Sequence, residues 1–181
     1  DRELLIQWIR SGRDIVTRAN ETAHLTASAW VVSPDRKHVL MAYHNIYNSW
    51  AWLGGHADGE WNLQKVAIRE VEEESGLSKV TLWQETPISL EILTVDGHWK
   101  HGTYVASHLH LNVTYLMEAD PKMPVRKKLD ENSAGMECTK RLDRAILWYF
   151  TGHVHFYPCI YRPGRWHHHP AAGVFIICQS H

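Results

Sequence analysis

Residues 55–77 read GHADGEWNLQKVAIREVEEESGL, and this stretch decides the fold. One helical face, at spacings of three and four residues, begins apolar, turns acidic and ends apolar: Leu63, Val66, Ala67, Glu70, Glu73, Glu74 and Leu77. Three carboxylates on an inward stripe would repel one another and lose hydration unless a cation lies between them. The stretch therefore predicts a helix that supplies half of a divalent-cation site.

The ends of this helix are also predicted by their residue types. Asp58 and Gly59 are a turn pair before the helix. Asn62 suits the N-cap position, and Gly76 suits a left-handed C-terminal cap. We therefore expect the helix to begin just after Asn62 and to end just before Gly76.

The same stretch resembles the Nudix box, whose pattern is Gly, five residues, Glu, seven residues, Arg-Glu, an aliphatic residue, any residue, Glu-Glu, any residue, Gly and an aliphatic residue. The positions in register are Gly55, Arg69, Glu70, Val71, Glu73, Glu74, Gly76 and Leu77. Trp61 stands where the box has its first Glu. In the family that Glu is mainly a partner of the box arginine, so we expect Glu60 or Asp58 to replace it only in part.

The resemblance to Nudix hydrolases extends over residues 20–135, through AHLTASAWVVSP, VLMAYHNIYNSWAWLGGHADG and HGTYVASHLHLNVTYL. Strands are expected at 25–32, 39–44, 50–53, 80–84, 89–95 and 103–117, and an amphipathic helix over 3–11 with Leu4, Leu5, Trp8 and Ile9 on its packed face. Strands on both sides of an acidic helix predict an α/β fold with a mixed β-sheet. The resemblance implies the Nudix form of that class, an α/β/α sandwich.

Three segments are expected along the chain: an N-terminal helical segment at 1–22, a Nudix hydrolase domain at 23–143 and an atypical C-terminal tail at 144–181. The tail contains no Asp, Glu, Lys or Asn, yet it holds six of the 14 histidines. Ordinary helix and strand surfaces do not have this composition. A shifted reading frame and a divergent extension both remain open as explanations, and we expect the tail to pack loosely or to be disordered.

Composition favours one globular enzyme domain. A chain of 181 residues with 44% hydrophobic and 22% charged residues is long enough for a well-buried core. A net charge of -1 argues against bulk nucleic-acid binding, which needs a basic field. No run approaches the about 18 apolar residues of a membrane span, and the charged start lacks the apolar core of a signal peptide. We expect a cytoplasmic protein without a membrane partner.

The resemblance implies roles for the box residues. Glu73 and Glu74 are expected to bind the metal, and Glu70 is expected to be a ligand or the base that takes a proton from water. Arg69 orients the carboxylates, and the carbonyl of Gly55 adds a further oxygen ligand. Mg²⁺ is the expected cofactor, with Mn²⁺ as the alternative, because carboxylate oxygens suit both ions.

A further catalytic carboxylate is expected from a later loop. Glu131, in LDENS, is the best placed candidate, and an exposed loop acid is the alternative for it. For substrate binding, Tyr47 and Trp50 are candidates to stack a planar group, although aromatic residues near a strand are often core. Lys100 and His101 are candidates for phosphate contacts.

His108 and His110 alternate along an expected strand and therefore share one face of it. A transition-metal site would need three or four ligands that converge, with further groups to orient them. Phosphate contacts at Lys100 and His101, or plain structural roles, are the alternatives for this histidine-rich region.

The resemblance implies a Mg²⁺-dependent hydrolase that cleaves a diphosphate linkage in a nucleoside diphosphate joined to another group. The expected partner is this small-molecule substrate, and a homodimer stays open. Two alternatives are an isomerase that uses the same fold on isopentenyl diphosphate and a non-catalytic module that binds a nucleotide to regulate a partner. Arg69, Glu70, Glu73 and Glu74 favour the enzyme, whereas Trp61 favours the module.

Overall fold

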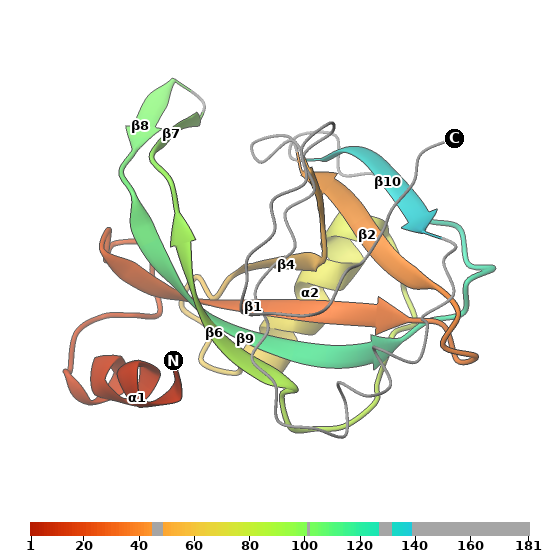
Figure 1. Ribbon diagram of the computed structural model, residues 1–181, viewed down its shortest axis with the longest axis horizontal. Helices are drawn as coiled ribbons and strands as arrows, with labels where there is room; N and C mark the ends of the chain where they lie inside the picture. Colours follow the sequence, from red (N-terminus) through yellow and green to blue (C-terminus); the bar gives the residue numbers. More distant parts are fainter. Residues whose placement is uncertain (45–48, 101, 127–131, 139–181) are drawn as a thin grey trace, which may run out of the picture.

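The computed structural model describes residues 1–44, 49–100, 102–126 and 132–138 (Figure 1). The site predictions for Tyr47, His101 and Glu131, and every prediction for the tail at 144–181, lie outside these residues. Trp50 lies on a strand, and only its backbone is described. Within the described ranges, no helix has the length and apolar character that a membrane span requires.

Two helices and ten strands follow one another along the described chain. They are α1 (Arg2–Arg10), β1 (Ala23–Val32), β2 (Val39–His44), β3 (Ser49–Ala51), β4 (Leu53–His56), α2 (Leu63–Ser75), β5 (Thr81–Leu82), β6 (Ser89–Val95), β7 (His98–Lys100), β8 (Thr103–Val105), β9 (His108–Glu118) and β10 (Asn132–Cys138). The predicted strands at 25–32, 39–44 and 89–95 are confirmed, with a shifted start only for β1.

The main sheet is mixed, as predicted. At its centre β1 runs parallel to β9, in a register that pairs Ala23 with Leu109 and Val32 with Glu118. The antiparallel partners of β1 are β2 and β4, while β5 and β6 pair antiparallel with β9 on its other side. The central pair β1 and β9 therefore has hydrogen-bonded strands on both sides. The predicted α/β class with a mixed sheet is confirmed.

Two strand predictions are wrong in the same way, because each joined two strands into one. The stretch 103–117 is interrupted at the exposed residues Ala106 and Ser107: β8 pairs with β7 in a separate hairpin, while β9 enters the main sheet. The Ser107 hydroxyl accepts a hydrogen bond from the N–H of Gly97 at 2.9 Å and closes the base of that hairpin. Likewise, 50–53 is divided between β3, which pairs with β2, and β4, which pairs with β1.

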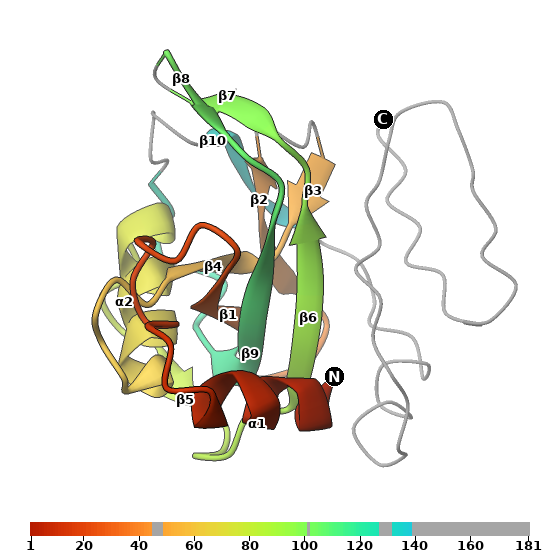
Figure 2. The same ribbon diagram turned by 90° about the vertical axis from the view of Figure 1, so that its left-hand side faces the viewer.

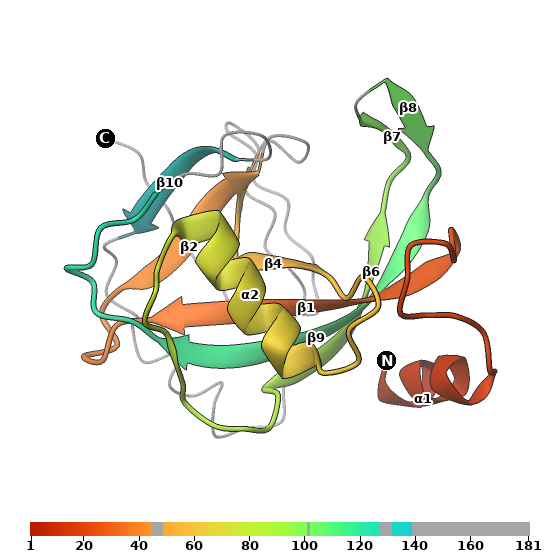
Figure 3. The ribbon, with the colours of Figure 1, turned by 180° about the vertical axis from the view of Figure 1, so that it is seen from behind.

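Helix α2 covers one face of the main sheet (Figures 2 and 3). Alternation along β1 puts Leu25, Ala27, Ala29 and Val31 in one buried cluster with Val66, Ala67 and Val71 of the helix. Burying each large aliphatic side chain of such a cluster stabilises the fold by about 1.5–3 kcal/mol. The even-numbered residues of β1, from His24 to Val32, face the other way, so the two faces of the sheet differ in chemistry.

Helix α1 packs beside β6 (Figure 2). Leu5 is buried in the core, Trp8 packs against it, and the Asp1 carboxylate accepts a hydrogen bond from the N–H of Ile92 at 3.0 Å. The prediction that Leu4 and Ile9 share the packed face is wrong, because they are 43% and 49% exposed. A single short helix that packs against a sheet buries only one narrow stripe of its surface, and in α1 that stripe contains Leu5 and Trp8.

Candidate functional site

The caps of α2 are those predicted from the sequence. The Asn62 side chain accepts a hydrogen bond from the N–H of Lys65 at 3.1 Å. Gly76 has a φ of 70°, which is left-handed, and its N–H donates to the Glu72 carbonyl at 2.8 Å. With both ends defined, the buried residues Val66 and Val71 orient the helix so that its acidic face meets β4.

Two of the three box carboxylates lie against the glycines of β4. Glu70 is 9% exposed, and a Cβ atom added to Gly55 would lie 2.5 Å from its Cδ, closer than real contacts allow. The N–H of Gly54 donates to Glu74 Oε2 at 3.2 Å. Glu73 is nearer to solvent, with 49% of its side chain exposed. The two glycines are therefore needed for close approach, not for backbone conformation.

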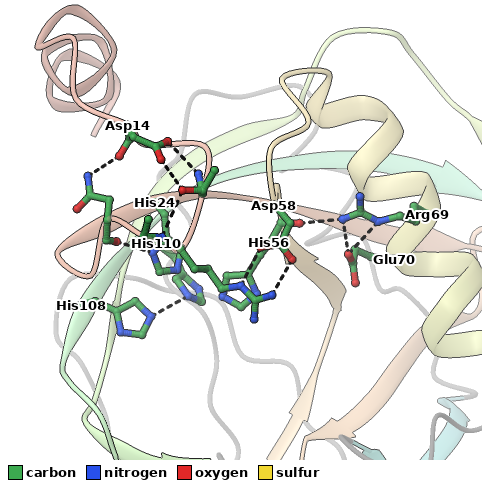
Figure 4. Close-up of polar contacts among 12 residues, drawn as sticks. Asp14, His24, His56, Asp58, Arg69, Glu70, His108 and His110 are labelled. Carbon is green, nitrogen blue, oxygen red and sulfur yellow. Dashed lines mark hydrogen bonds and ion pairs between the residues drawn. The ribbon is translucent and has the colours of Figure 1, made fainter.

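Arg69 holds the buried carboxylate from the other side (Figure 4). Its Nη2 donates to Glu70 Oε1 and to the His56 carbonyl, each at 2.8 Å, and its Nε lies 3.9 Å from Glu73 Oε1. The hydrogen bond to Glu70 is the main reason that the pKa of Arg69 is raised. The arginine therefore fixes Glu70 relative to β4 at two points.

Trp61 does not contribute to these contacts, because it is 63% exposed. Among the described residues, the expected substitution by Glu60 does not occur: its carboxylate accepts from the N–H of Asn62 at 2.8 Å. Asp58 is paired instead with Arg18, at 2.8 and 3.0 Å, and acts on Arg69 only through its charge, which helps to raise the pKa of that guanidinium. The side-chain partners of Arg69 are thus Glu70 and Glu73.

The donor chemistry at this point suits a divalent cation of the Mg²⁺ type. Glu70, Glu73 and Glu74 offer carboxylate oxygens from one helical face, and the backbone of Gly55 lies against the most buried of them. Mg²⁺ and Mn²⁺ prefer such hard oxygen ligands over nitrogen or sulfur. Glu70 and Glu74 therefore both lie at the glycines of β4, while Glu73 lies on the same helical face beside Arg69.

Lys100 ends β7, on the hairpin that projects from the main sheet (Figure 1). The charge of Lys100 acts on His56 of β4. Burial lowers the pKa of His56 to about 4, and the Lys100 cation adds to this lowering. The hairpin therefore places a cation within electrostatic range of the His56 ring on β4.

A buried polar network on the sheet face away from α2 was not predicted. Asn112 Oδ1 accepts from the Thr26 and Ser28 hydroxyls, each at 2.9 Å, and its Nδ2 donates to Glu91 Oε2 at 2.9 Å and to Thr114 Oγ1 at 3.0 Å. The polar residues at 110, 112 and 114, between apolar neighbours, were the pattern that could have revealed it. Both the acceptor and the donor of the Asn112 amide are fully used.

Replacement of Gly55 by Ala should separate activity from stability. The three atoms nearest to the added Cβ all belong to the Glu70 side chain, so the carboxylate must move while the backbone can stay in place. We expect hydrolysis to fall by about 10²-fold, as for a displacement of about 1 Å at a reacting group. The melting temperature should change little.

Gly54→Ala is the matched control. There the added Cβ would lie 2.7 Å from the Ala27 carbonyl and 2.8 Å from Ser28 Cα, so the backbone must shift. We expect a loss of about 2 kcal/mol in the free energy of unfolding, measured by urea denaturation. Unchanged kinetics in folded Gly55→Ala would contradict the placement of Glu70 at the reacting centre.

Comparison with solved structures finds several similar proteins. A NUDIX-family hydrolase from Clostridium perfringens is 20% identical over 64% of this chain and 81% of that chain, with a TM-score of 0.46. The C. elegans Ap4A hydrolase in a binary complex is 20% identical over 68% and 83%, with a TM-score of 0.46. The E. coli dihydroneopterin triphosphate pyrophosphohydrolase is 12% identical over 65% and 80%, with a TM-score of 0.47.

Comparison with curated protein sequences gave no significant match. The family model of the NUDIX domain, in contrast, matches residues 22–137. This match covers more than half of the chain and includes the whole of α2 with the glycines of β4. The chain therefore belongs to the Nudix family.

Proposed function

We propose that this member of the Nudix family is a Mg²⁺-dependent hydrolase that cleaves the diphosphate linkage of a nucleoside diphosphate joined to another group. The observation that supports it best is the position of the Glu70 carboxylate, buried between Gly55 and Arg69 with Glu73 and Glu74 on the same helical face. Without a cation, this arrangement would concentrate negative charge at a partly buried place. A diphosphate bridged by a divalent cation complements it.

In this proposal Glu70, Glu73, Glu74 and the Gly55 carbonyl hold the metal ion. The bound ion would neutralise the phosphate oxygens and make the attacking water more acidic. Glu70 is either a ligand or the base that accepts the proton of that water. Arg69 keeps Glu70 in place through its two hydrogen bonds, to the carboxylate and to the backbone of β4.

The remaining predicted residues complete the proposal. Lys100 contacts the substrate phosphates, for which its electrostatic reach to β4 is the supporting observation. Roles for His101 in the same contact, for Tyr47 and Trp50 in stacking, and for Glu131 as an alternative base rest on the sequence. Each requires its own substitution, because kinetics can divide their roles: loss of a stacking group raises KM, whereas loss of the base lowers kcat.

A substrate panel tests the proposal directly. Dinucleoside polyphosphates, nucleotide sugars, nucleoside triphosphates and isopentenyl diphosphate are incubated with the full chain in Mg²⁺, in Mn²⁺ and in EDTA, and the release of phosphate and nucleotide is measured. We expect hydrolysis of a nucleoside diphosphate derivative with either cation and none in EDTA. Nucleotide binding without turnover would instead support the regulatory module, and rearrangement of isopentenyl diphosphate the isomerase.

Mg²⁺ should also raise the melting temperature of the protein. A ligand that binds only the folded state stabilises it by about 2.7 kcal/mol at 100 times its Kd. In the variant with Glu70, Glu73 and Glu74 all replaced by Gln, we expect this rise to disappear. Glu72→Gln, which changes an exposed carboxylate of the same helix, should keep it. Equal rises in the parent and the triple variant would remove the cation from these residues.

A further inference from the structure

Four histidines gather on the face of the main sheet that points away from α2 (Figure 4). The parallel register pairs His24 of β1 with His110 of β9, and His108 lies two residues earlier on the same face. His56 of β4 joins them, since its register partner Thr26 is two residues from His24. Neighbouring ring centroids are 4.9–5.2 Å apart. We call these four residues the histidine cluster.

Backbone carbonyls set the tautomer of two members of the histidine cluster. His24 Nδ1 lies 3.0 Å from the Asn20 carbonyl, and His108 Nδ1 lies 2.8 Å from the Ala106 carbonyl. A carbonyl only accepts, so each Nδ1 must carry the hydrogen, and in the neutral ring each Nε2 then has a free lone pair. An Nδ1–H bonded to a carbonyl is the arrangement that orients metal-binding histidines in proteins.

One of these two Nε2 atoms has no partner among the described residues, and the other contacts a neighbouring imidazole of the histidine cluster. His24 is 4% exposed, and within the described part of the chain its Nε2 is buried without a hydrogen-bond partner. His108 Nε2 lies 3.2 Å from His110 Nε2. A buried unpaired nitrogen needs an explanation, because nearly all buried polar atoms have a partner. A bound cation supplies one.

The distances also suit a metal ion. One ligand nitrogen from each of His24, His108 and His110 lies within 4.8 Å of the other two. Zn–N bonds of about 2.0–2.1 Å in a tetrahedral site place their nitrogens about 3.4 Å apart. The separation of 3.2 Å between His108 and His110 is already close to this value. Small side-chain rotations of His24 would complete the approach.

Burial also affects the charge of these rings. It lowers the pKa of His24, that of His56 to about 4 and that of His110 to about 2, and the neighbouring imidazoles add to the lowering. Burial therefore favours the neutral form of these three rings. Neutral imidazoles give a phosphate no charge to bind, whereas they are the form that a metal ion requires.

We propose that His24, His108 and His110 form a second metal site, for a borderline transition-metal cation such as Zn²⁺, with His56 beside it. Imidazole nitrogens favour Zn²⁺ and its neighbours over Mg²⁺, so the site differs in chemistry from the carboxylates of α2. Three ligands leave a fourth position to water or to His56. Because the ligands come from β1 and β9, the bound ion joins the two central strands of the sheet.

Titration with Co²⁺ tests the site, because tetrahedral Co²⁺ absorbs visible light far more strongly than octahedral Co²⁺. His167, His168 and His169 are replaced by Gln in every protein compared, so that this run does not contribute. Metal-free full chain should show the strong absorption at one equivalent of Co²⁺, and Zn²⁺ should displace it. His108→Gln and His110→Gln should weaken binding by at least about 100-fold, as expected for loss of a direct ligand.

Two controls separate this site from other effects. The triple Gln variant of Glu70, Glu73 and Glu74 should keep the absorption, because those residues belong to the other site. His38→Gln should keep it as well, because the His38 ring hydrogen-bonds to the Ser33 hydroxyl and lies outside the histidine cluster. Circular dichroism of the metal-free proteins checks that each variant is folded.

Weak absorption in the parent, or equal affinity in the parent and in folded His108→Gln, would overturn the proposal. A direct N–H···N hydrogen bond would then account for the contact between His108 and His110. If the variants do not fold, NMR spectroscopy of the parent protein tests the site instead. One equivalent of Zn²⁺ should shift the imidazole nitrogen resonances of His24, His108 and His110, and unchanged resonances would equally overturn the site.

Discussion

Glu70→Gln should lower the rate of diphosphate hydrolysis by about 10²–10⁴-fold, the usual contribution of a general base. The amide keeps the size of the side chain and its place against Gly55, yet it cannot accept a proton and carries no charge for a cation. The variant also loses the charge-assisted bond from Arg69, which lies at 2.8 Å. Initial rates at saturating substrate and Mg²⁺ measure the effect on kcat.

Glu72→Gln is the matched control, since it makes the same chemical change on the exposed side of α2. It should leave kcat within about twofold of the parent, as expected for a surface change away from the site. Glu131→Gln shows which carboxylate is the base. A loss of this size in Glu131→Gln alone would move the base to the later loop and leave Glu70 as a ligand or as a residue without a role in the reaction.

Asn112→Asp should reduce the free energy of unfolding by about 3 kcal/mol. Asn112 is 1% exposed, and its amide donates to Glu91, which is 8% exposed. The substitution removes both donors, leaves Thr114 with one bond fewer, and puts a second carboxylate beside Glu91 inside the fold. Urea denaturation at pH 7, followed by circular dichroism, measures the loss.

Asn62→Asp is the control for this prediction. It makes the same change at the N-cap of α2, where Asp accepts the hydrogen bond from Lys65 as well as Asn does. We expect a change within about 0.5 kcal/mol there. If Asn112→Asp were as mild as Asn62→Asp, the hydrogen bonds around Asn112 would not be a closed network in solution.

Local chemistry allowed helix α2 to be predicted almost in full. The cap at Asn62 and the left-handed turn at Gly76 depend on residues within four positions of each end, so the sequence shows them directly. The packed face of Val66 and Ala67 follows from the helical repeat in the same way. Strand β6 was predicted at its observed bounds, because apolar residues of high β propensity fill it.

Strand breaks were not predictable from the same patterns. An extended run can leave one sheet for another, as at Ala106 and Ser107, without any change in composition. It can also change its partner strand within one sheet, as at Trp52 between β3 and β4. What decides the break is which backbone groups find partners, and those partners are distant in sequence. The expected substitution of Asp58 for the missing partner of Arg69 fails for a similar reason. Asp58 forms an ion pair with Arg18, which is 40 residues away in the sequence.

The sequence by itself determined the acidic helix, its caps, the box that assigns the family and the shared face of His108 and His110. Only the tertiary structure decided that His24 and His56 complete the histidine cluster, that Glu91 meets Asn112, and that the box glycines lie against Glu70 and Glu74. The physical reason is register. A shift of one residue between β1 and β9 would move every side chain of the shifted strand to the opposite face, and no local pattern specifies that pairing.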